Sequence, residues 1–240
     1  VTANRYPPLP IEHHTLAIWR ELAKAADEYH VFARSAVGAG GTSLHENIHL
    51  HLVPSVLERQ AEVFLTGWAV STLARAVRPE VIVAQCPVMG GWAAARAASA
   101  VGAALFVEMH GEHLFRQQGS GMRRSAVFTR LARPVLDQAV AIRVLSPQML
   151  DSLRATYGHQ TADKGVIVPT RVDVDLFRRS KNDYRLKGPL KLVCVGSYIP
   201  LKNHLALMRD VADIPHVLLT IVGQGPLRAA YEAEIRRLGL

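Results

Sequence analysis

The chain has 240 residues, of which 49% are hydrophobic and 20% charged, and this composition excludes a disordered polypeptide. The apolar runs are all shorter than the ~18 residues of a membrane-spanning helix, so we predict no membrane span. Two cysteines, Cys86 and Cys194, lie far apart in apolar runs, which argues against a disulfide framework and fits a reducing compartment. The net charge of +8 suits phosphate ligands, nucleic acid or anionic lipid, and composition alone does not choose among them.

Short apolar runs alternate with longer segments of helical periodicity, which predicts parallel βαβ units and an α/β fold. Helices are expected at 13–26, 57–76, 91–101 and 125–138. Strands are expected at 30–33, 80–85, 104–109, 141–145 and 166–169. Each crossover is long enough to carry a helix back over the sheet, so we expect neighbouring strands to be parallel.

The polar segment RRSKNDYRLKGP at 178–189 loses all periodicity and is interpreted as a linker over 179–189. The same alternation then restarts, with strands expected at 190–195 and 216–222 and helices at 204–211 and 227–238. We therefore predict two domains, 1–178 and 190–240. Because two strands are too few for a sheet covered on both faces, the second domain is expected to be incomplete.

The segment HENIH at 45–49 matches H-E-x-x-H, which on a helix presents two zinc ligands and a general base. Here the apolar residues at 48, 50 and 52 alternate with His49 and His51, which predicts an edge-like strand with exposed imidazoles. On one strand, His45 and His49 would lie about 13 Å apart, too far to share a zinc ion. We therefore predict no metal site in this segment.

Two glycine-containing turns of the first domain carry weaker signals. The stretch GAGG at 38–41 lacks a third glycine and a following helix, so it is interpreted as a flexible loop. The stretch CPVMGG at 86–91 lies between a strand and a helix, where backbone amides could meet an anion. Turn chemistry alone also accounts for it, and both interpretations stay open.

The segment VEMHGEH at 107–113 ends a buried strand in a histidine followed by a glycine. Ligands of open α/β sheets bind beyond the carboxyl ends of the strands, so His110 would project into that crevice. Gly111 would let a substrate approach the backbone. A structural role for His110 and a functional one are both left open, and Glu112 and His113 are weaker candidates.

The second domain carries the segment VGSYIPLKN at 195–203, a strand followed by a glycine turn and a lysine before a helix. Gly196 allows close approach, and Lys202 supplies a mobile ammonium for phosphate oxygens, so this geometry suits a diphosphate. The segment IVGQGP at 221–226 repeats the strand-to-glycine design with Gly223 and Gly225. A lone Gly-x-Gly is a weak signal.

The order and spacing of these segments resemble family 4 retaining glycosyltransferases of the GT-B fold, in which two Rossmann-like domains face each other across a cleft. The resemblance covers nearly the whole chain. The segments that carry it are YPP at 6–8, RPEVI at 78–82, HG at 110–111, VLS at 144–146, IVPTRVD at 167–173 with Phe177, GSYIPLKN at 196–203 and IVGQGP at 221–226.

The resemblance implies roles for particular residues. Lys202 and Gly196 match the positions that hold the donor diphosphate, and His110 matches the histidine near the reacting sugar. Ser197 stands where many members have an arginine, and Thr170-Arg171 replaces the usual Asn-Gly. The implied donor-binding set is Gly196, Ser197, Lys202, Gly223 and Gly225, and the implied acceptor-side loop set is Pro8, Glu12 and Gly111. Because Pro10-Ile11-Glu12 replaces the common glycine pair, contacts from that loop cannot be transferred.

The implied activity is transfer of a sugar from a nucleotide-diphosphate donor to an acceptor hydroxyl with retained configuration and no obligatory metal or cofactor. The implied partners are the nucleotide sugar and a carbohydrate, lipid or small-molecule acceptor, with peripheral membrane contact as an option and no nucleic acid. A cytoplasmic location follows, including the cytoplasmic face of a membrane. The alternatives are a GT-B nucleotide-sugar epimerase or hydrolase, and a non-catalytic basic module that binds membrane or nucleic acid.

Overall fold

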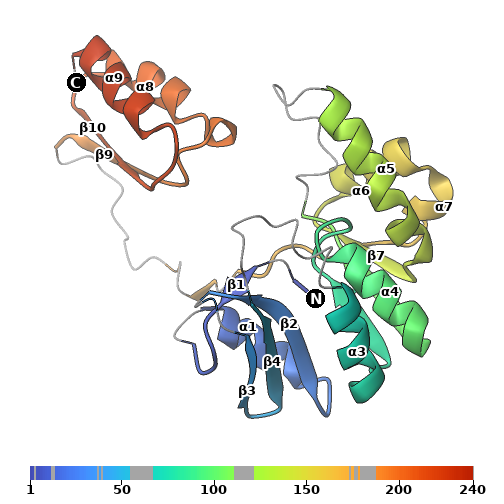
Figure 1. Cartoon of the computed structure of the whole chain (residues 1–240). Helices are drawn as coiled ribbons and strands as arrows, with labels where there is room; N and C mark the ends of the chain where they lie inside the picture. Colours follow the sequence, from blue (N-terminus) through green and yellow to red (C-terminus); the bar gives the residue numbers. More distant parts are fainter. Residues whose placement is uncertain are drawn as a thin grey trace. The chain divides into compact units, whose positions relative to one another are not determined.

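The computed structural model describes residues 1–2, 4–11, 14–36, 38, 40–54, 67–110, 122–172, 174–175, 178 and 188–239. The chain forms two compact units, Val1–Val172 and Asp173–Leu240, and both are α/β (Figure 1). Most of the expected linker 179–189 lies outside the described residues. In the described ranges, no helix is long and apolar enough to cross a membrane.

The first unit contains a four-stranded sheet in the order β1-β2-β4-β3. Its strands are β1 (Arg5–Tyr6), β2 (Tyr29–Ser35), β3 (Gly41–His45) and β4 (Ile48–Val53). Strand β4 alternates buried and half-buried residues, as its period of two predicts. Its buried side packs with α1 (His14–Ala23) around Trp19, Leu50 and Val31.

A second sheet of the same unit has the order β5-β6-β7-β8, and all its strands are parallel. Its strands are β5 (Val81–Ala84), β6 (Ala104–Glu108), β7 (Ala141–Val144) and β8 (Gly165–Ile167). Residues 1–2 join the two sheets. The Val1 carbonyl accepts a hydrogen bond from Gln85 N–H at 3.1 Å, and Thr2 N–H donates to the Phe32 carbonyl at 3.0 Å. Residues 1–2 therefore link the two four-stranded sheets through backbone hydrogen bonds.

Helices pack against these sheets (Figure 1). They are α3 (Gly67–Val77), α4 (Gly91–Val101), α5 (Met122–Gln138), α6 (Pro147–Tyr157) and α7 (His159–Ala162). The buried side of α4 consists of glycine and alanine, which allows close packing between helices. Gly102 ends α4 in the left-handed conformation at φ 72°. Of the helix expected at 57–76, residues 57–66 lie outside the described ranges.

The second unit contains a parallel pair, β9 (Leu190–Val195) and β10 (Val217–Val222). The 3₁₀ turn η2 (Pro200–Lys202) and the helices α8 (His204–Ala212) and α9 (Arg228–Leu238) complete it. Val193 and Val195 are 68% and 75% exposed, so one side of the pair is open to solvent in this unit. The expected strand and helix order of 190–240 is confirmed.

The structure corrects the sequence analysis around β3 and β4. Strand β3 was not expected from the sequence and runs antiparallel to β4, whereas β5 to β8, which follow one another through helical crossovers, are parallel as expected. The stretch at 38–41 leads into β3, which begins at Gly41. Strand β4 lies between β2 and β3 and is not an edge strand. Its histidines are half-buried, because their neighbours on β2 and β3 cover them.

Candidate functional site

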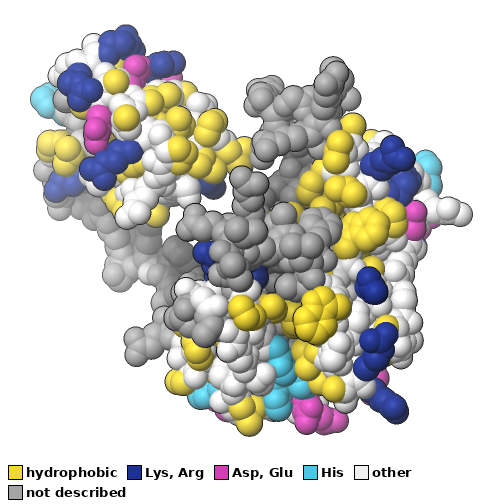
Figure 2. All heavy atoms as spheres, viewed as in Figure 1, with side chains coloured by type: hydrophobic (Ala, Val, Ile, Leu, Met, Phe, Trp, Pro, Cys, Tyr) yellow, Lys and Arg dark blue, Asp and Glu magenta, His cyan; other side chains and the backbone are white. Residues whose placement is uncertain are grey.

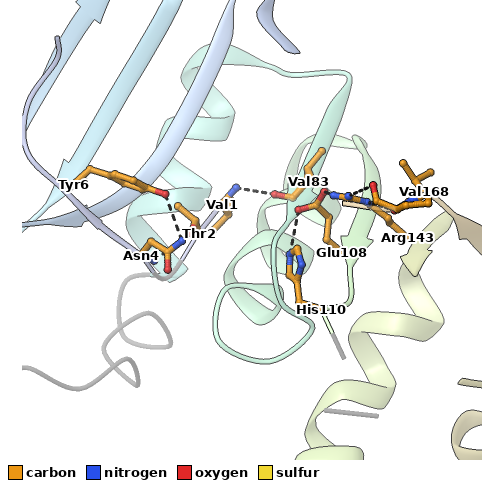
Figure 3. A network of polar contacts seen from close by, with 10 residues as sticks. Val1, Thr2, Asn4, Tyr6, Val83, Glu108, His110, Arg143 and Val168 are labelled. Carbon is orange, nitrogen blue, oxygen red and sulfur yellow. Dashed lines mark hydrogen bonds and ion pairs between the residues drawn. The ribbon is translucent and has the colours of Figure 1, made fainter. Parts of the chain in front are cut away.

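The end of β6 places a carboxylate and an imidazole beside an arginine of the neighbouring strand β7. The Glu108 carboxylate lies 2.7 Å from Nη1 of Arg143 and 3.6 Å from Nε2 of His110. Figure 3 shows Arg143 and His110 reaching Glu108 from different sides. His110 is about half exposed (48%) and Glu108 only 20%, so the carboxylate is largely shielded while the imidazole beside it is open to solvent.

Arg143 also holds the chain segment that follows β8. Its Nε donates to the Val168 carbonyl at 2.9 Å, and its Nη2 donates to the Pro169 carbonyl at 3.0 Å (Figure 3). One guanidinium thus connects β6, β7 and the segment that leaves the first unit. The planar fork of arginine suits this task because it offers several donors in a fixed geometry.

The electrostatics of Glu108 follow from these contacts. Burial pushes the pKa of Glu108 upward, but hydrogen bonds from His110 and Arg143 and the charge of Arg143 outweigh it. The net result is a pKa below the ordinary value. Glu108 therefore stays ionised at neutral pH.

Replacing Arg143 with methionine is expected to destabilise the first unit by about 2–3 kcal/mol, because Glu108 and two carbonyls lose charge-assisted partners. The loss depends on pH, since the folded-state pKa of Glu108 is depressed. Its stabilisation is complete above the ordinary pKa of 4.5 and disappears as the pH falls through the lowered value. Urea unfolding of both proteins between pH 7 and pH 3 measures this difference in the free energy of unfolding.

A matched control is Arg154→Met in α6, whose ion pair with Asp151 lies at the surface. Exposed pairs contribute little, so this change is expected to cost less than about 1 kcal/mol at any pH. A difference between wild type and Arg143→Met that stays constant from pH 7 to pH 3 would contradict the assigned role of Glu108.

The acceptor-side loop predicted from the sequence is described only in part. Pro8 lies in the exposed loop that follows β1. Next to it, Leu9 N–H donates to Oγ of Ser43 at 2.9 Å, which ties the loop to β3. Glu12 and Gly111 lie outside the described residues. Pro8 and His110 thus both follow carboxyl ends of strands, the edge at which open α/β sheets bind ligands.

The turn at 86–91 has a packing role. A Cβ at Gly91 would lie 2.8 Å from the carbonyl oxygen of Cys86 and 3.0 Å from Val135. The Cys86 sulfur accepts a hydrogen bond from Met89 N–H at 3.3 Å, which closes the turn. Close packing therefore explains the glycine at this helix start without an anion.

In the second unit, the glycine turn after β9 lies against the lysine before α8. A Cβ at Gly196 would be 3.3 Å from Nε2 of His204 and 3.7 Å from Cδ of Lys202, so both side chains border this glycine. Lys202 ends η2 and is exposed, and Ser197 in the same turn is exposed as well. Among residues 188–239, the structure gives the Lys202 ammonium no carboxylate partner. This exposed cation precedes α8, and the start of a helix is a place where anions bind favourably.

Gly223 and Gly225 lie directly on this turn. A Cβ at Gly223 would overlap the carbonyl oxygen of Gly196, and one at Gly225 would lie 2.6 Å from the carbonyl oxygen of Tyr198. The Tyr198 N–H also donates to the Gln224 carbonyl at 2.8 Å. The structure thus brings Gly196, Lys202, Gly223 and Gly225 together, and the last two glycines permit the contact between the loops.

Sequence reasoning missed the buried aromatic support of this turn. His204, only 2% exposed, lies 3.2 Å from the Tyr231 hydroxyl through Nδ1. The Tyr198 ring contacts both of these side chains, and its hydroxyl donates to the Ile221 carbonyl at 3.1 Å. These contacts join α8, α9 and β10 beneath the turn. No local pattern predicts them, because Tyr231 is 27 residues from His204.

The structure separates the histidines of the H-E-x-x-H match more completely than the strand spacing predicted. Residues 46 and 47 form a turn between β3 and β4, and His45 pairs with Ile48. His45 therefore faces the opposite side of the sheet from His49, and its Nε2 lies 2.6 Å from Nη2 of Arg20. The two histidines cannot share an ion.

His51 belongs to the other side of the sheet, where burial and then the neighbouring His30 and His49 lower its pKa to about 4. On that side, within the described ranges, Glu28, His30 and His49 lie close enough to hold a metal ion. This group lies at the amino ends of β2 and β4, whereas His110 follows the carboxyl end of β6. It is therefore separate from the candidate site at His110.

Comparison with known proteins gives a family match. Residues 11–171, about two thirds of the chain, match the glycosyl transferase 4-like domain. No curated protein matches the chain.

Several solved structures are similar to the chain. A glycosyltransferase from Rickettsia africae ESF-5 has 13% identity and a TM-score of 0.63, with 98% of this chain and 65% of that chain covered. The catalytic domain of starch synthase IV from Arabidopsis thaliana, bound to ADP and acarbose, has 9% identity and a TM-score of 0.67, with 97% and 70% covered. UDP-GlcNAc 2-epimerase from Methanocaldococcus jannaschii has 12% identity and a TM-score of 0.52, with 93% and 64% covered.

At these identities the likeness shows the fold. The chain has the α/β fold with parallel sheets of the GT-B glycosyltransferases, and this expectation is confirmed. The chain spans about two thirds of the length of these three structures.

Proposed function

Because the chain belongs to the glycosyl transferase 4-like domain family, we propose that it serves transfer of a sugar from a nucleotide-diphosphate donor to an acceptor hydroxyl, with retained configuration. The observation that carries the donor assignment is the turn after β9. There Lys202, whose ammonium has no carboxylate partner among residues 188–239, lies near Gly196 and the start of α8. The ADP in the similar starch synthase structure supports a nucleotide ligand for this fold.

The chemical task at this turn is to stabilise the leaving diphosphate. As the bond between the anomeric carbon and the phosphate oxygen breaks, negative charge grows on the diphosphate. Lys202 and the backbone at Gly196 are arranged before the reaction, and one such preorganised donor contributes roughly 3–4 kcal/mol in characterised enzymes. Neither a metal nor a cofactor is part of this proposal.

His110 is proposed to position the sugar or share its developing charge. Glu108 orients the imidazole, and Arg143 holds Glu108 in turn. In a front-side transfer, the acceptor oxygen forms the new bond to the anomeric carbon, and a departing phosphate oxygen takes the acceptor proton. We therefore assign no side chain as general base.

The acceptor is proposed to be a carbohydrate, a lipid or a small molecule. A hollow lined by Trp68, Trp92 and Arg96 lies on the first unit, and the two indoles are 69% and 40% exposed. Exposed tryptophan beside basic charge suits a membrane surface. The protein is also proposed to be cytoplasmic and to associate with the cytoplasmic face of a membrane. Binding of nucleic acid is not part of the proposal.

A second function rests on the likeness to the archaeal epimerase, which shares the fold. Such a protein would epimerise or hydrolyse the nucleotide sugar without an acceptor. A non-catalytic basic module is the third reading, since the net charge is +8. Its binding to membrane or nucleic acid would weaken steeply with salt.

The deciding experiment incubates the full-length protein with UDP-, ADP- and GDP-sugars, with and without acceptors that include a lipid in anionic vesicles. Acceptor-dependent release of the nucleoside diphosphate and an unchanged anomeric configuration in the product by NMR are the expected results. Conversion without acceptor would instead establish an epimerase or hydrolase. Turnover of no donor, together with salt-sensitive sedimentation on the vesicles, would favour the non-catalytic module.

A further inference from the structure

Three histidines line one side of the first sheet, where β2 and β4 pair. His30 is directly opposite His49 in the parallel register, and Phe32 is opposite His51. The His30 ring stacks on both other rings, with centroids 4.5 Å from His49 and 5.2 Å from His51. Figure 2 shows histidine side chains gathered on this unit next to acidic ones.

A carboxylate, that of Glu28 just before β2, lies beside these three histidines. Its Oε2 lies 3.0 Å from Nε2 of His30, and one ligand atom from each of Glu28, His30 and His49 lies within 4.8 Å of the others. In a tetrahedral zinc site with bonds of about 2.0–2.2 Å, neighbouring ligand atoms are about 3.3 Å apart. The Glu28 and His30 atoms already have nearly this spacing.

The chain also provides the outer hydrogen bonds that a metal-binding imidazole needs. Nδ1 of His30 lies 2.9 Å from Nε2 of His51, and Nδ1 of His51 lies 3.1 Å from Oγ1 of Thr42. When the His30 proton is on Nδ1, that N–H donates a hydrogen bond to Nε2 of His51. The lone pair on Nε2 of His30 is then free on the side of Glu28. Metal-binding histidines use their second nitrogen in this way, which fixes the tautomer and the ring orientation.

We propose that Glu28, His30 and His49 bind a zinc ion, with water as the fourth ligand and with His51 and Thr42 orienting His30. Two imidazoles and a carboxylate form a donor set that zinc takes readily. The rings of His30 and His49 are nearly parallel, at 12°, so a shared ion requires the His49 ring to turn. The χ2 torsion of histidine is broad, which makes this adjustment cheap.

The position of the site defines its role. His30 and His49 lie at the amino ends of their strands, whereas parallel sheets bind substrates at the carboxyl ends. The ion would hold β2 against β4 and stabilise the first unit, and it would take no part in sugar transfer. The proposal therefore stands independently of the activity.

The test measures zinc binding to the whole chain, freed of metal with a chelator, by titration calorimetry and elemental analysis. We expect one zinc ion per chain and, at zinc a hundredfold above Kd, a rise in Tm of about 5–10 °C that EDTA reverses. His49→Ala is expected to abolish both effects. Glu28→Gln keeps the shape of an exposed side chain, so it should fold normally while weakening zinc binding tenfold or more.

The matched control is His159→Ala, which removes an exposed histidine of the same unit outside this cluster. It is expected to bind zinc like the wild type. Failure of the folded wild type to take up zinc would overturn the proposal. Equal binding by wild type, His49→Ala and Glu28→Gln would overturn it too, because the zinc would then be held by other groups.

Discussion

His110→Ala is expected to lower kcat about a hundredfold while the affinity for the nucleoside diphosphate stays unchanged. Removing one group that stabilises transition-state charge costs this much in characterised enzymes. His110 follows the carboxyl end of β6 and is half exposed, while Glu108 holds its imidazole. The proposed diphosphate site is in the second unit, so the Kd for the nucleoside diphosphate should not change when His110 is replaced. Steady-state kinetics and calorimetry on the same preparation separate the two quantities.

His159→Ala is the matched control for this experiment as well, because it removes an exposed imidazole of the same unit. Its kcat is expected to equal that of the wild type. His110→Asn retains a hydrogen-bonding group and is expected to recover part of the lost rate. A kcat of His110→Ala within twofold of the wild type, with Tm unchanged, would remove His110 from the reaction.

Lys202→Ala is expected to raise the Kd for the nucleoside diphosphate at least tenfold. Charge-assisted hydrogen bonds contribute roughly 1.5–3 kcal/mol. The Lys202 stem lies near Gly196, and among residues 188–239 no carboxylate pairs with its ammonium. Calorimetry of the full-length protein with UDP, ADP and GDP measures the change. Lys202→Arg keeps the positive charge but changes the shape of the cationic group. Its Kd should therefore lie between those of the wild type and Lys202→Ala.

Lys191→Ala is the control for Lys202, since Lys191 is an exposed lysine on β9 of the same unit. It lowers the net charge equally, so any general electrostatic effect on an anionic ligand appears in both variants. Equal losses in the two would mean that only overall charge matters. Unchanged affinity in Lys202→Ala would remove Lys202 from the donor site.

Much of the fold could be predicted because its signals are local. The helix at 91–101 and the strand at 190–195 were predicted to the residue. Periodicity of apolar residues marks such elements without knowledge of their partners. The position of His110 beyond a strand end and the convergence of Gly196 with Lys202 follow from the same local order along the chain. Their functional roles remain predictions.

What could not be predicted depends on pairing between distant residues. The antiparallel β3 escaped notice because a hairpin and a single strand share the same alternation around the turn at 46–47. The sequence gives only a weak signal for the contact between Glu108 and Arg143. Each is a charged residue in an otherwise apolar strand, and a charge that is partly buried needs a partner. Nothing local identifies Arg143 as that partner of Glu108, 35 residues away.

The hydrogen bonds of residues 1–2 have a consequence for the order of folding. Thr2 bonds to Phe32 on one side, while Val1 bonds to Val83 and Gln85 on the other. During synthesis, the strands up to β4 can pair as soon as they emerge, but Val1 has to wait until residue 85 is made. Closing such a large loop carries an entropic cost before the contact rewards it. The joining of the first sheet to the second through residues 1–2 is therefore expected to be a late and slow event in folding of the first unit.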